Sequence, residues 1–197
     1  MLFVDVRGFT SLAERLPPAE VAQRLNRFYL LASKAIFDDD GTLDKLVGDQ
    51  VMAFFGAPLY AEDHPARAVQ VAVRILQGTH DLAQADGLYV GAGIATGEAF
   101  VGNVGGGEVT DYTVLGDTVN VAARLQGAAA AGEILVTEET YAAVAPKFPD
   151  LPPREIELRG KSEPVRARAI VVNGAAARQR SSRVGAAVER NSRRRHY

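Results

Sequence analysis

The segment from Lys45 to Asp49 constrains the fold most, because it lies between two apolar runs, 42–47 and 51–55, that are typical of β-strands. A Gly-Asp pair between two strands predicts a tight hairpin, since glycine adopts positive φ without steric cost and aspartate tolerates a turn. The carboxylate of Asp49 is therefore expected at the rim of a sheet, where it can meet a ligand. On its own, such a turn is more often structural than functional.

A second aspartate, Asp5, stands inside the apolar run 2–6, which also predicts a strand. Burying a carboxylate without a partner costs free energy, so this acid requires a paired base or a bound cation. The glycine-containing turn 7–10 follows and is expected to open a short helix that ends near residue 15. Free amides at such a helix start are suited to hold a phosphate group.

The stretch 111–125 is the third informative segment. Asp117 or Thr118 can cap a helix there, and Asn120 and Arg124 are four residues apart, which places both on one helical face. An amide beside a guanidinium suits a sugar hydroxyl and a phosphate, because guanidinium binds phosphate oxygens in a fork. The alternative, an exposed helix face with incidental polarity, remains open on this helix alone.

Four other features favour structural explanations. The aspartates 38–40 end a helix and are expected in a solvated loop rather than at a metal. His64 has no second histidine at metal-ligand spacing, which favours a contact at the start of a helix. The glycine-rich run 102–107 lacks a Walker A pattern and predicts a hairpin tip. Lys161, beside a glycine in a turn, either contacts a terminal phosphate or is simply solvated.

The predicted elements indicate an α/β (α+β) fold of the ferredoxin-like kind, with a mostly antiparallel sheet flanked by helices. The longer helices are expected at 19–37, 62–82, 117–131 and 138–144, and the remaining strands at 89–96, 99–104, 133–136, 154–158 and 165–172. We expect one domain over residues 1–172 and a disordered tail over 173–197. The tail holds seven arginines and one glutamate, so it is basic, while the preceding body is acidic.

Several classes of protein are disfavoured by what the sequence lacks. There is no cysteine, which excludes disulfides and thiolate metal sites. No apolar run approaches the roughly 20 residues of a membrane span, and no secretory signal opens the sequence. We therefore expect a cytoplasmic location and no membrane segment. The first strand begins almost at Met1, so we also expect the natural chain to continue upstream.

Four sequence blocks, in order and with suitable gaps, together resemble the signatures of class III nucleotidyl cyclases. They are Phe3-x-Asp5-x-x-Gly8-Phe9-Thr10, Lys45-x-x-Gly48-Asp49, Gly116-Asp117-Thr118-Val119-Asn120-x-Ala122-x-Arg124 and Gly160-Lys161. The resemblance covers about residues 2–172. It implies the nucleotidyl cyclase version of the expected fold. No Gly-Gly-Asp/Glu-Glu-Phe loop of a diguanylate cyclase is present.

The resemblance also implies a role for each matching residue. Asp5, Asp49 and the backbone carbonyl of Val6 would bind two Mg²⁺ or Mn²⁺ ions. The amides around Gly8, Phe9 and Thr10 would receive the β- and γ-phosphates, and Lys161 the terminal phosphates. Among the remaining residues, Asn120 would orient the ribose and Arg124 would stabilise charge on the α-phosphate.

Lys45 and Thr113 fall where the family reads the purine, and this pair implies adenine. Lysine can donate to N1 of adenine but would face the N1–H donor of guanine. Guanylyl members typically carry glutamate and cysteine at these two positions. Thr113 departs from the aspartate of the animal enzymes, as it does in many bacterial members.

The implied reaction is attack of the ribose 3′ oxygen of ATP on the α-phosphorus, giving 3′,5′-cyclic AMP and pyrophosphate with help from two metal ions. The family builds its sites across a head-to-tail homodimer, often under the control of a fused regulatory domain. Three alternatives stay open. They are a guanylate cyclase, a catalytically inactive module for dimerisation or nucleotide sensing, and a protein that binds nucleic acid through the arginine-rich tail. Of these, we disfavour the last and expect no nucleic acid partner.

Overall fold

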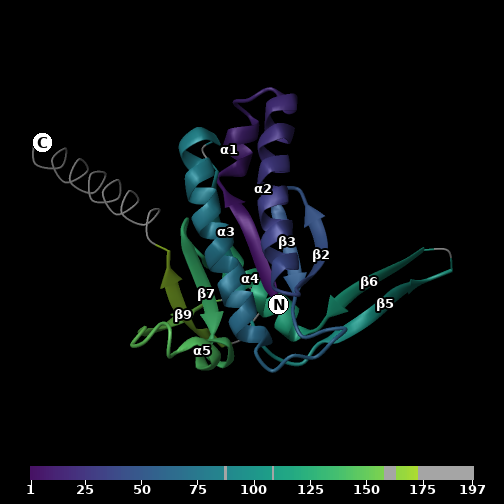
Figure 1. Ribbon diagram of the computed structural model, residues 1–197, viewed down its shortest axis with the longest axis vertical. Helices are drawn as coiled ribbons and strands as arrows, with labels where there is room; N and C mark the ends of the chain where they lie inside the picture. Colours follow the sequence, from purple (N-terminus) through teal and green to yellow (C-terminus); the bar gives the residue numbers. More distant parts are fainter. Residues whose placement is uncertain (87, 108, 158–162, 173–197) are drawn as a thin grey trace, which may run out of the picture.

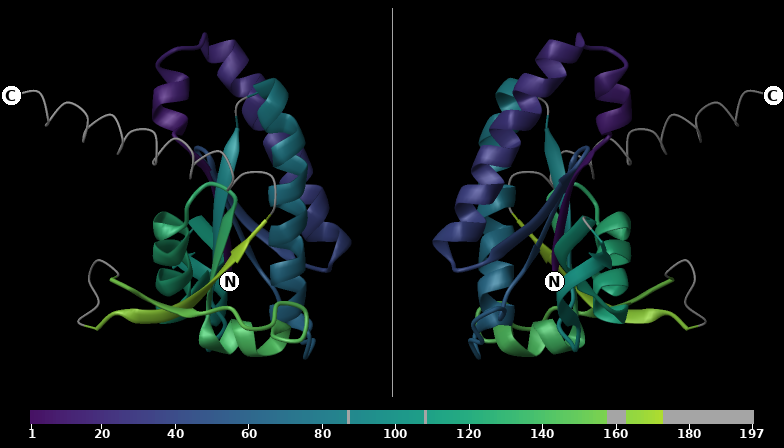
Figure 2. Two further views of the ribbon diagram at one scale, coloured as in Figure 1. Left: turned by 90° about the vertical axis from the view of Figure 1, so that its left-hand side faces the viewer. Right: turned by 90° about the vertical axis from the view of Figure 1, so that its right-hand side faces the viewer.

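A mixed β-sheet with helices on both faces forms the body of the protein (Figures 1 and 2). The structure is a computed structural model, and it describes residues 1–86, 88–107, 109–157 and 163–172. Over these ranges it contains a seven-stranded sheet of order β2-β3-β1-β4-β7-β9-β8 and a two-stranded sheet, β5-β6. Neighbouring strands are antiparallel except β4 and β7, which are parallel. The expected α/β (α+β), mostly antiparallel architecture is confirmed.

The bounds of the elements lie close to those predicted, apart from one strand. The strands are β1 Leu2–Arg7, β2 Thr42–Val47, β3 Gln50–Phe54, β4 Tyr89–Ile94, β5 Phe100–Gly106, β6 Val109–Leu115, β7 Glu133–Thr137, β8 Pro153–Ile156 and β9 Val165–Val171. The helices are α1 Phe9–Ala13, α2 Pro18–Asp38, α3 His64–Asp86, α4 Asp117–Ala128 and α5 Glu138–Val144. None of the helices within the described ranges is long and apolar enough to cross a membrane.

The glycine-rich run differs in part from its prediction. A hairpin is present, but β5 extends through Gly106, so most of these glycines lie within the strand and not at its tip. The partner strand β6 was not predicted, because its residues were interpreted only as the approach to a helix. Together β5 and β6 project away from the main sheet (Figure 1).

The central strand β1 separates the two layers of the core. Leu2, Val4 and Val6 pack in the cluster that includes residues of α2 and α3, whereas Phe3 packs with residues of α4. Successive side chains of a strand point to opposite faces, so Asp5 lies on the same face as Phe3. The acid in this strand therefore faces the α4 side of the sheet.

Helix α4 lies directly on β4 because β4 has glycine where the two elements meet. A Cβ atom at Gly93 would lie 2.1 Å from the backbone nitrogen of Gln126 and 2.3 Å from the carbonyl oxygen of Ala122. No side chain fits in that space, so the glycine sets how closely α4 approaches the sheet. The position of every residue on α4 depends on this contact.

Replacing Gly93 by alanine is expected to push α4 outward and to lower the free energy of unfolding by about 1–3 kcal/mol, the usual cost of overpacking a core. Thermal unfolding followed by circular dichroism measures the change. The matched control is Gly127→Ala on α4 itself, because a Cβ atom at Gly127 would meet nothing within 4 Å. This control should be neutral or slightly stabilising, since alanine favours helix over glycine. Equal stability of both variants would contradict the proposed contact.

Candidate active site

The structure brings Asp5 and Asp49 to the same end of the sheet. Gly48 and Asp49 form the predicted two-residue turn between β2 and β3, with Gly48 at φ 59°. The backbone N–H of Val6 donates to the carbonyl oxygen of Asp49 over 3.2 Å, which holds this turn against the end of β1. The Tyr29 hydroxyl, from α2, donates to the Gly48 carbonyl and fixes the turn from the other side.

The two carboxylates stand in an environment that disfavours their charge. Burial, and then the negative charge of Asp49, raise the pKa of Asp5, and burial raises the pKa of Asp49. The guanidinium of Arg7 opposes both effects; its Nη1 lies 3.6 Å from Oδ1 of Asp5, and its Nη2 donates to the backbone carbonyl of Gln126. Arg7 compensates this charge only in part, so a bound cation would relieve the remaining repulsion.

The donor atoms at this end of the sheet fit a hard divalent cation. In an antiparallel strand the N–H and C=O of one residue point to the same side, so the Val6 carbonyl faces Asp49 as its N–H does. Two carboxylates and a carbonyl are oxygen ligands of the kind that Mg²⁺ and Mn²⁺ prefer. The described residues hold no cluster of three or more acidic or histidine side chains, so the remaining ligands would be water and substrate phosphate.

The turn that follows β1 carries backbone N–H groups without helical partners, a few residues after Asp5 in the sequence. Gly8 adopts the left-handed conformation at φ 72° and precedes α1, whose first residues are Phe9 and Thr10. The first amides of a helix have no partner within the helix and point outward along its axis. A side chain at Gly8 would meet nothing within 4 Å, so this side of the turn is open.

A polar cluster joins β2 to β6 and contains both predicted base-reading residues. Nζ of Lys45 lies 3.1 Å from the Thr113 hydroxyl, 2.5 Å from Asp111 and 3.4 Å from Asp44. The Thr113 hydroxyl also donates to Asp44 over 3.2 Å. The hydrogen bond to Asp111 is the main reason that the pKa of Lys45 is raised. The sequence interpretation missed Asp44 and Asp111, although Asp44 is an acid inside an apolar strand, as Asp5 is.

Asn120 and Arg124 lie on the outer face of α4. The residues of this helix that pack on the sheet are Val121, Ala122, Leu125 and Gln126. With 3.6 residues per turn, positions 120 and 124 fall on the opposite side of the helix. Among the residues that the structure describes, the Arg124 side chain makes no hydrogen bond or ion pair, so it is available to a ligand.

Asn120 and Arg124 are therefore not brought to the Asp5 and Asp49 pair of their own chain. The α4 residue that reaches this pair is Gln126, on the inner face of the helix. Its side chain hydrogen-bonds Asp5, and its side-chain oxygen accepts a hydrogen bond from Gln50 over 3.2 Å. Lys161 lies outside the described residues, as does the tail 173–197.

The three consecutive aspartates do not gather at one point. Asp38 pairs with Lys34, Asp39 with Arg74 and Asp40 with Arg67. Each of the three carboxylates thus pairs with a basic side chain, and the segment contributes ion pairs rather than a ligand set.

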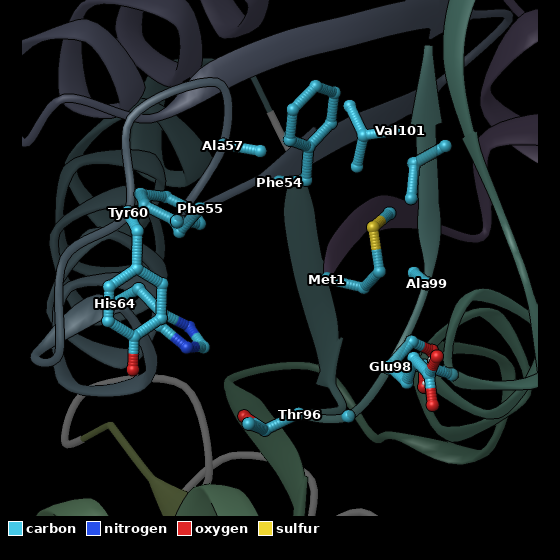
Figure 3. A pocket seen from close by; sticks show the side chains of 14 residues that line it. Met1, Phe54, Phe55, Ala57, Tyr60, His64, Thr96, Glu98, Ala99 and Val101 are labelled. Atoms are coloured by element: carbon cyan, nitrogen blue, oxygen red, sulfur yellow. Dashed lines mark hydrogen bonds between the residues drawn. The ribbon is translucent and has the colours of Figure 1, made fainter.

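A separate hollow of about 270 Å³ lies at the opposite end of β1, beside Met1. Figure 3 shows Tyr60 and His64 on one side of it and Glu98 on the other. His64 is the first residue of α3, and its ring stands edge-on to that of Tyr60, so the predicted contact at a helix start is present. Burial lowers the pKa of His64. This hollow is distinct from the carboxylate pair and from the Lys45 cluster.

Comparison with known proteins places this arrangement in a family. The family described as adenylate and guanylate cyclase catalytic domain matches residues 1–169. The chain belongs to this family. Adenylate cyclase 1 of Rhizobium meliloti is 37% identical over 132 residues, which cover 64% of this chain and 20% of that protein. An uncharacterized protein of Mycobacterium tuberculosis is 32% identical over 173 residues, which cover 84% of this chain and 31% of that protein.

Solved cyclase structures share the fold over most of the chain. The adenylyl cyclase CyaB from P. aeruginosa superposes with a TM-score of 0.78 at 36% identity, covering 86% of this chain and 91% of that one. The guanylyl cyclase Cya2 gives a TM-score of 0.78 at 32% identity, covering 85% and 88%. The chain spans only about a fifth to a third of the curated relatives' own length. The shared part is the catalytic domain.

Replacing Asp49 by asparagine is expected to stabilise the metal-free protein at neutral pH, because it removes one of two charges that burial penalises. The rise in Tm should not exceed about 3 °C, since solvent screens a half-buried group. Folding raises the pKa values of Asp5 and Asp49, so the ionised Asp49 destabilises the folded protein at a pH above its folded pKa. The stability gained in Asp49→Asn is therefore complete at neutral pH and shrinks as the pH falls toward the ordinary value of 3.8.

Mn²⁺ distinguishes this effect from a general change in stability. Thermal unfolding with and without Mn²⁺ should show stabilisation of the unmodified protein by the ion, and a much smaller effect on Asp49→Asn. Asp38→Asn is the control, because it removes an exposed aspartate that pairs with Lys34. If Mn²⁺ stabilises Asp49→Asn as much as the unmodified protein, the cation does not bind at this carboxylate pair.

Proposed function

We propose that the protein is an adenylate cyclase that converts ATP to 3′,5′-cyclic AMP and pyrophosphate. The observation that carries the adenine assignment is the pair formed by Lys45 and Thr113, whose side chains lie within hydrogen-bond distance across β2 and β6. An ammonium group suits the N1 acceptor of adenine, and a hydroxyl oxygen suits its 6-amino group. The similarity to adenylate cyclase 1 and to CyaB supports the same choice.

The residues of the other regions take the roles that the reaction needs. Asp5, Asp49 and the Val6 carbonyl would hold two Mg²⁺ or Mn²⁺ ions, which would supply Lewis acidity for the attacking hydroxyl and positive charge for the polyphosphate. The amides around Gly8, Phe9 and Thr10, with Lys161, bind the phosphate chain. These groups fix the triphosphate before reaction.

The outer face of α4 serves the reacting atoms. Asn120 hydrogen-bonds the ribose and keeps the 3′ oxygen in line with the α-phosphorus. Arg124 donates to the α-phosphate oxygens, where negative charge increases as the new P–O bond forms and pyrophosphate departs. A guanidinium group can stabilise this charge without a proton transfer.

The placement of these groups supports a site that is shared between two copies of the chain. Asn120 and Arg124 face away from the sheet, whereas Asp5 hydrogen-bonds Gln126 on the inner face of α4. One protomer therefore cannot apply both sets to one ATP, and a head-to-tail homodimer with two equivalent sites can. Exposed apolar side chains offer an interface: Leu46 and Val47 on β2, and Phe100, Tyr112 and Leu115 on the β5–β6 hairpin.

The experiment that tests the proposal incubates purified protein with ATP or GTP and Mn²⁺ and identifies the cyclic product. Cyclic AMP formed in preference to cyclic GMP is the expected result. A preference for cyclic GMP would favour the second candidate, a guanylate cyclase, which the similarity to Cya2 supports. No cyclic product from either nucleotide would favour an inactive binding module.

Mixing two inactive variants tests the shared site. Asp5→Ala removes a metal ligand and Arg124→Ala removes the α-phosphate contact, so each homodimer should be inactive. A mixed dimer keeps one intact site, and random exchange of subunits in an equal mixture should restore about a quarter of the original activity. Cyclic AMP production is measured after native mass spectrometry has shown that heterodimers form. Silence of a mixture that contains heterodimers would rule out the shared site.

The double variant Lys45→Glu with Thr113→Cys tests the base pocket. It removes the donor to N1 and the hydroxyl, and kcat/KM for ATP should fall about 10- to 100-fold, as expected when a charged hydrogen-bond donor is lost. Lys147→Glu makes the same charge change at an exposed lysine after α5 and should leave ATP turnover unchanged. Unchanged turnover of ATP by the double variant would mean that the purine binds elsewhere.

A further inference from the structure

Asp44 is a buried acid beside the base-reading pair, and no role described above uses it. Its side chain has no solvent exposure, and its Oδ1 atom is buried without a hydrogen-bond partner. The register of β2 against β3 shifts between Leu43 and Lys45, so Asp44 occupies a β-bulge. A bulge re-aims side chains that would otherwise alternate across the sheet, and here both Asp44 and Lys45 reach Thr113.

The hydrogen bonds of this cluster run from Lys45 to Thr113 and from Thr113 to Asp44. An ammonium group can only donate and an ionised carboxylate can only accept. The Thr113 hydroxyl therefore accepts from Lys45 over 3.1 Å and gives its single proton to Asp44 over 3.2 Å. One acceptor position remains on the Thr113 oxygen, and no proton remains there for a ligand.

We propose that Asp44 is a positioning residue that sets the purine specificity, because it holds the Thr113 hydroxyl as a hydrogen-bond acceptor toward the base. At position 6, adenine presents an amino donor and guanine presents a carbonyl acceptor. A hydrogen-bond acceptor in the protein therefore binds the amino group of adenine and repels the carbonyl oxygen of guanine. This inference rests on the proposed function, since it assumes that Lys45 and Thr113 contact the purine.

A simple counter-ion role for Asp44 does not account for the geometry. Lys45 already has a close partner in Asp111 at 2.5 Å, and its distance to Asp44 is longer, at 3.4 Å. Asp111 is half exposed, so it balances the ammonium charge at a smaller desolvation cost than a fully buried acid does. What Asp44 alone provides among the described residues is an acceptor for the Thr113 proton.

The test compares the binding of 3′-deoxy-ATP and 3′-deoxy-GTP, which cannot cyclise because they lack the attacking hydroxyl. Kd values are measured by calorimetry with Mn²⁺ for the unmodified protein, Asp44→Ala and Asp44→Asn. Asp44→Ala frees the Thr113 proton and should lower the preference for the adenine nucleotide about tenfold, the value of one hydrogen bond. Asp44→Asn keeps an oxygen in the place of Oδ2, the atom that accepts from both Lys45 and Thr113, and should retain most of the preference.

Thr113→Val provides a second, independent variant. It removes the hydroxyl through which Asp44 is proposed to act, so it should lower the preference by a similar factor. In the Thr113→Val background, Asp44→Ala should change the preference no further. A merely structural role of Asp44 predicts additive effects and an equal loss of affinity for both nucleotides.

The outcomes separate this inference from the proposed function. If Asp44→Ala folds and keeps the original preference for the adenine nucleotide, the inference is wrong, while cyclic AMP synthesis is unaffected. If Asp44→Ala does not fold, Thr113→Val decides in the same way. If the unmodified protein makes no cyclic product but binds 3′-deoxy-ATP preferentially and loses that preference in Asp44→Ala, the inference stands and the enzymatic function fails. Preferential binding of 3′-deoxy-GTP by the unmodified protein would overturn both.

Discussion

The repulsion between two carboxylates at one end of β1 is the constraint around which this domain is arranged. Asp5 is held in a central strand that pairs on both edges, with β3 and with β4, so the acid cannot move away from its neighbour. Asp49 is fixed by the turn that Tyr29 and the backbone of Val6 hold. Arg7 limits the electrostatic cost in the free protein. On the proposed function, the fold gives up some stability to keep these oxygen ligands assembled before a cation binds.

Much of this could be predicted from the sequence, because the signals were local. An acid inside an apolar strand and a Gly-Asp turn between strands made Asp5 and Asp49 candidates, and the structure brings them to the same end of the sheet. Helix α5 was also predictable, since Thr137 caps it through its own side chain. The ferredoxin-like arrangement followed from the order of the elements and from the resemblance, not from the spacing of any single motif.

What could not be predicted depends on irregular or distant contacts. The bulge at Asp44 leaves no mark in the periodicity of β2, yet it decides that Asp44 and Lys45 share a partner on β6. Strand β6 consists largely of β-branched and aromatic residues that favour strands, so it was missed only because its residues were interpreted as the approach to a helix. The outward direction of Arg124 depends on how α4 sits on Gly93, which only the packed structure reveals.

If the exposed apolar side chains of β2 and of the β5–β6 hairpin form a dimer interface, the rate of product formation depends on protein concentration. If the site is complete only in a pair of chains, the quantity of active enzyme below the dissociation constant of the dimer increases with the square of the protein concentration. Catalytic output would then respond more steeply than linearly to changes in expression. Any tethered neighbour that raises the local concentration of this domain would act as an activator without touching the site.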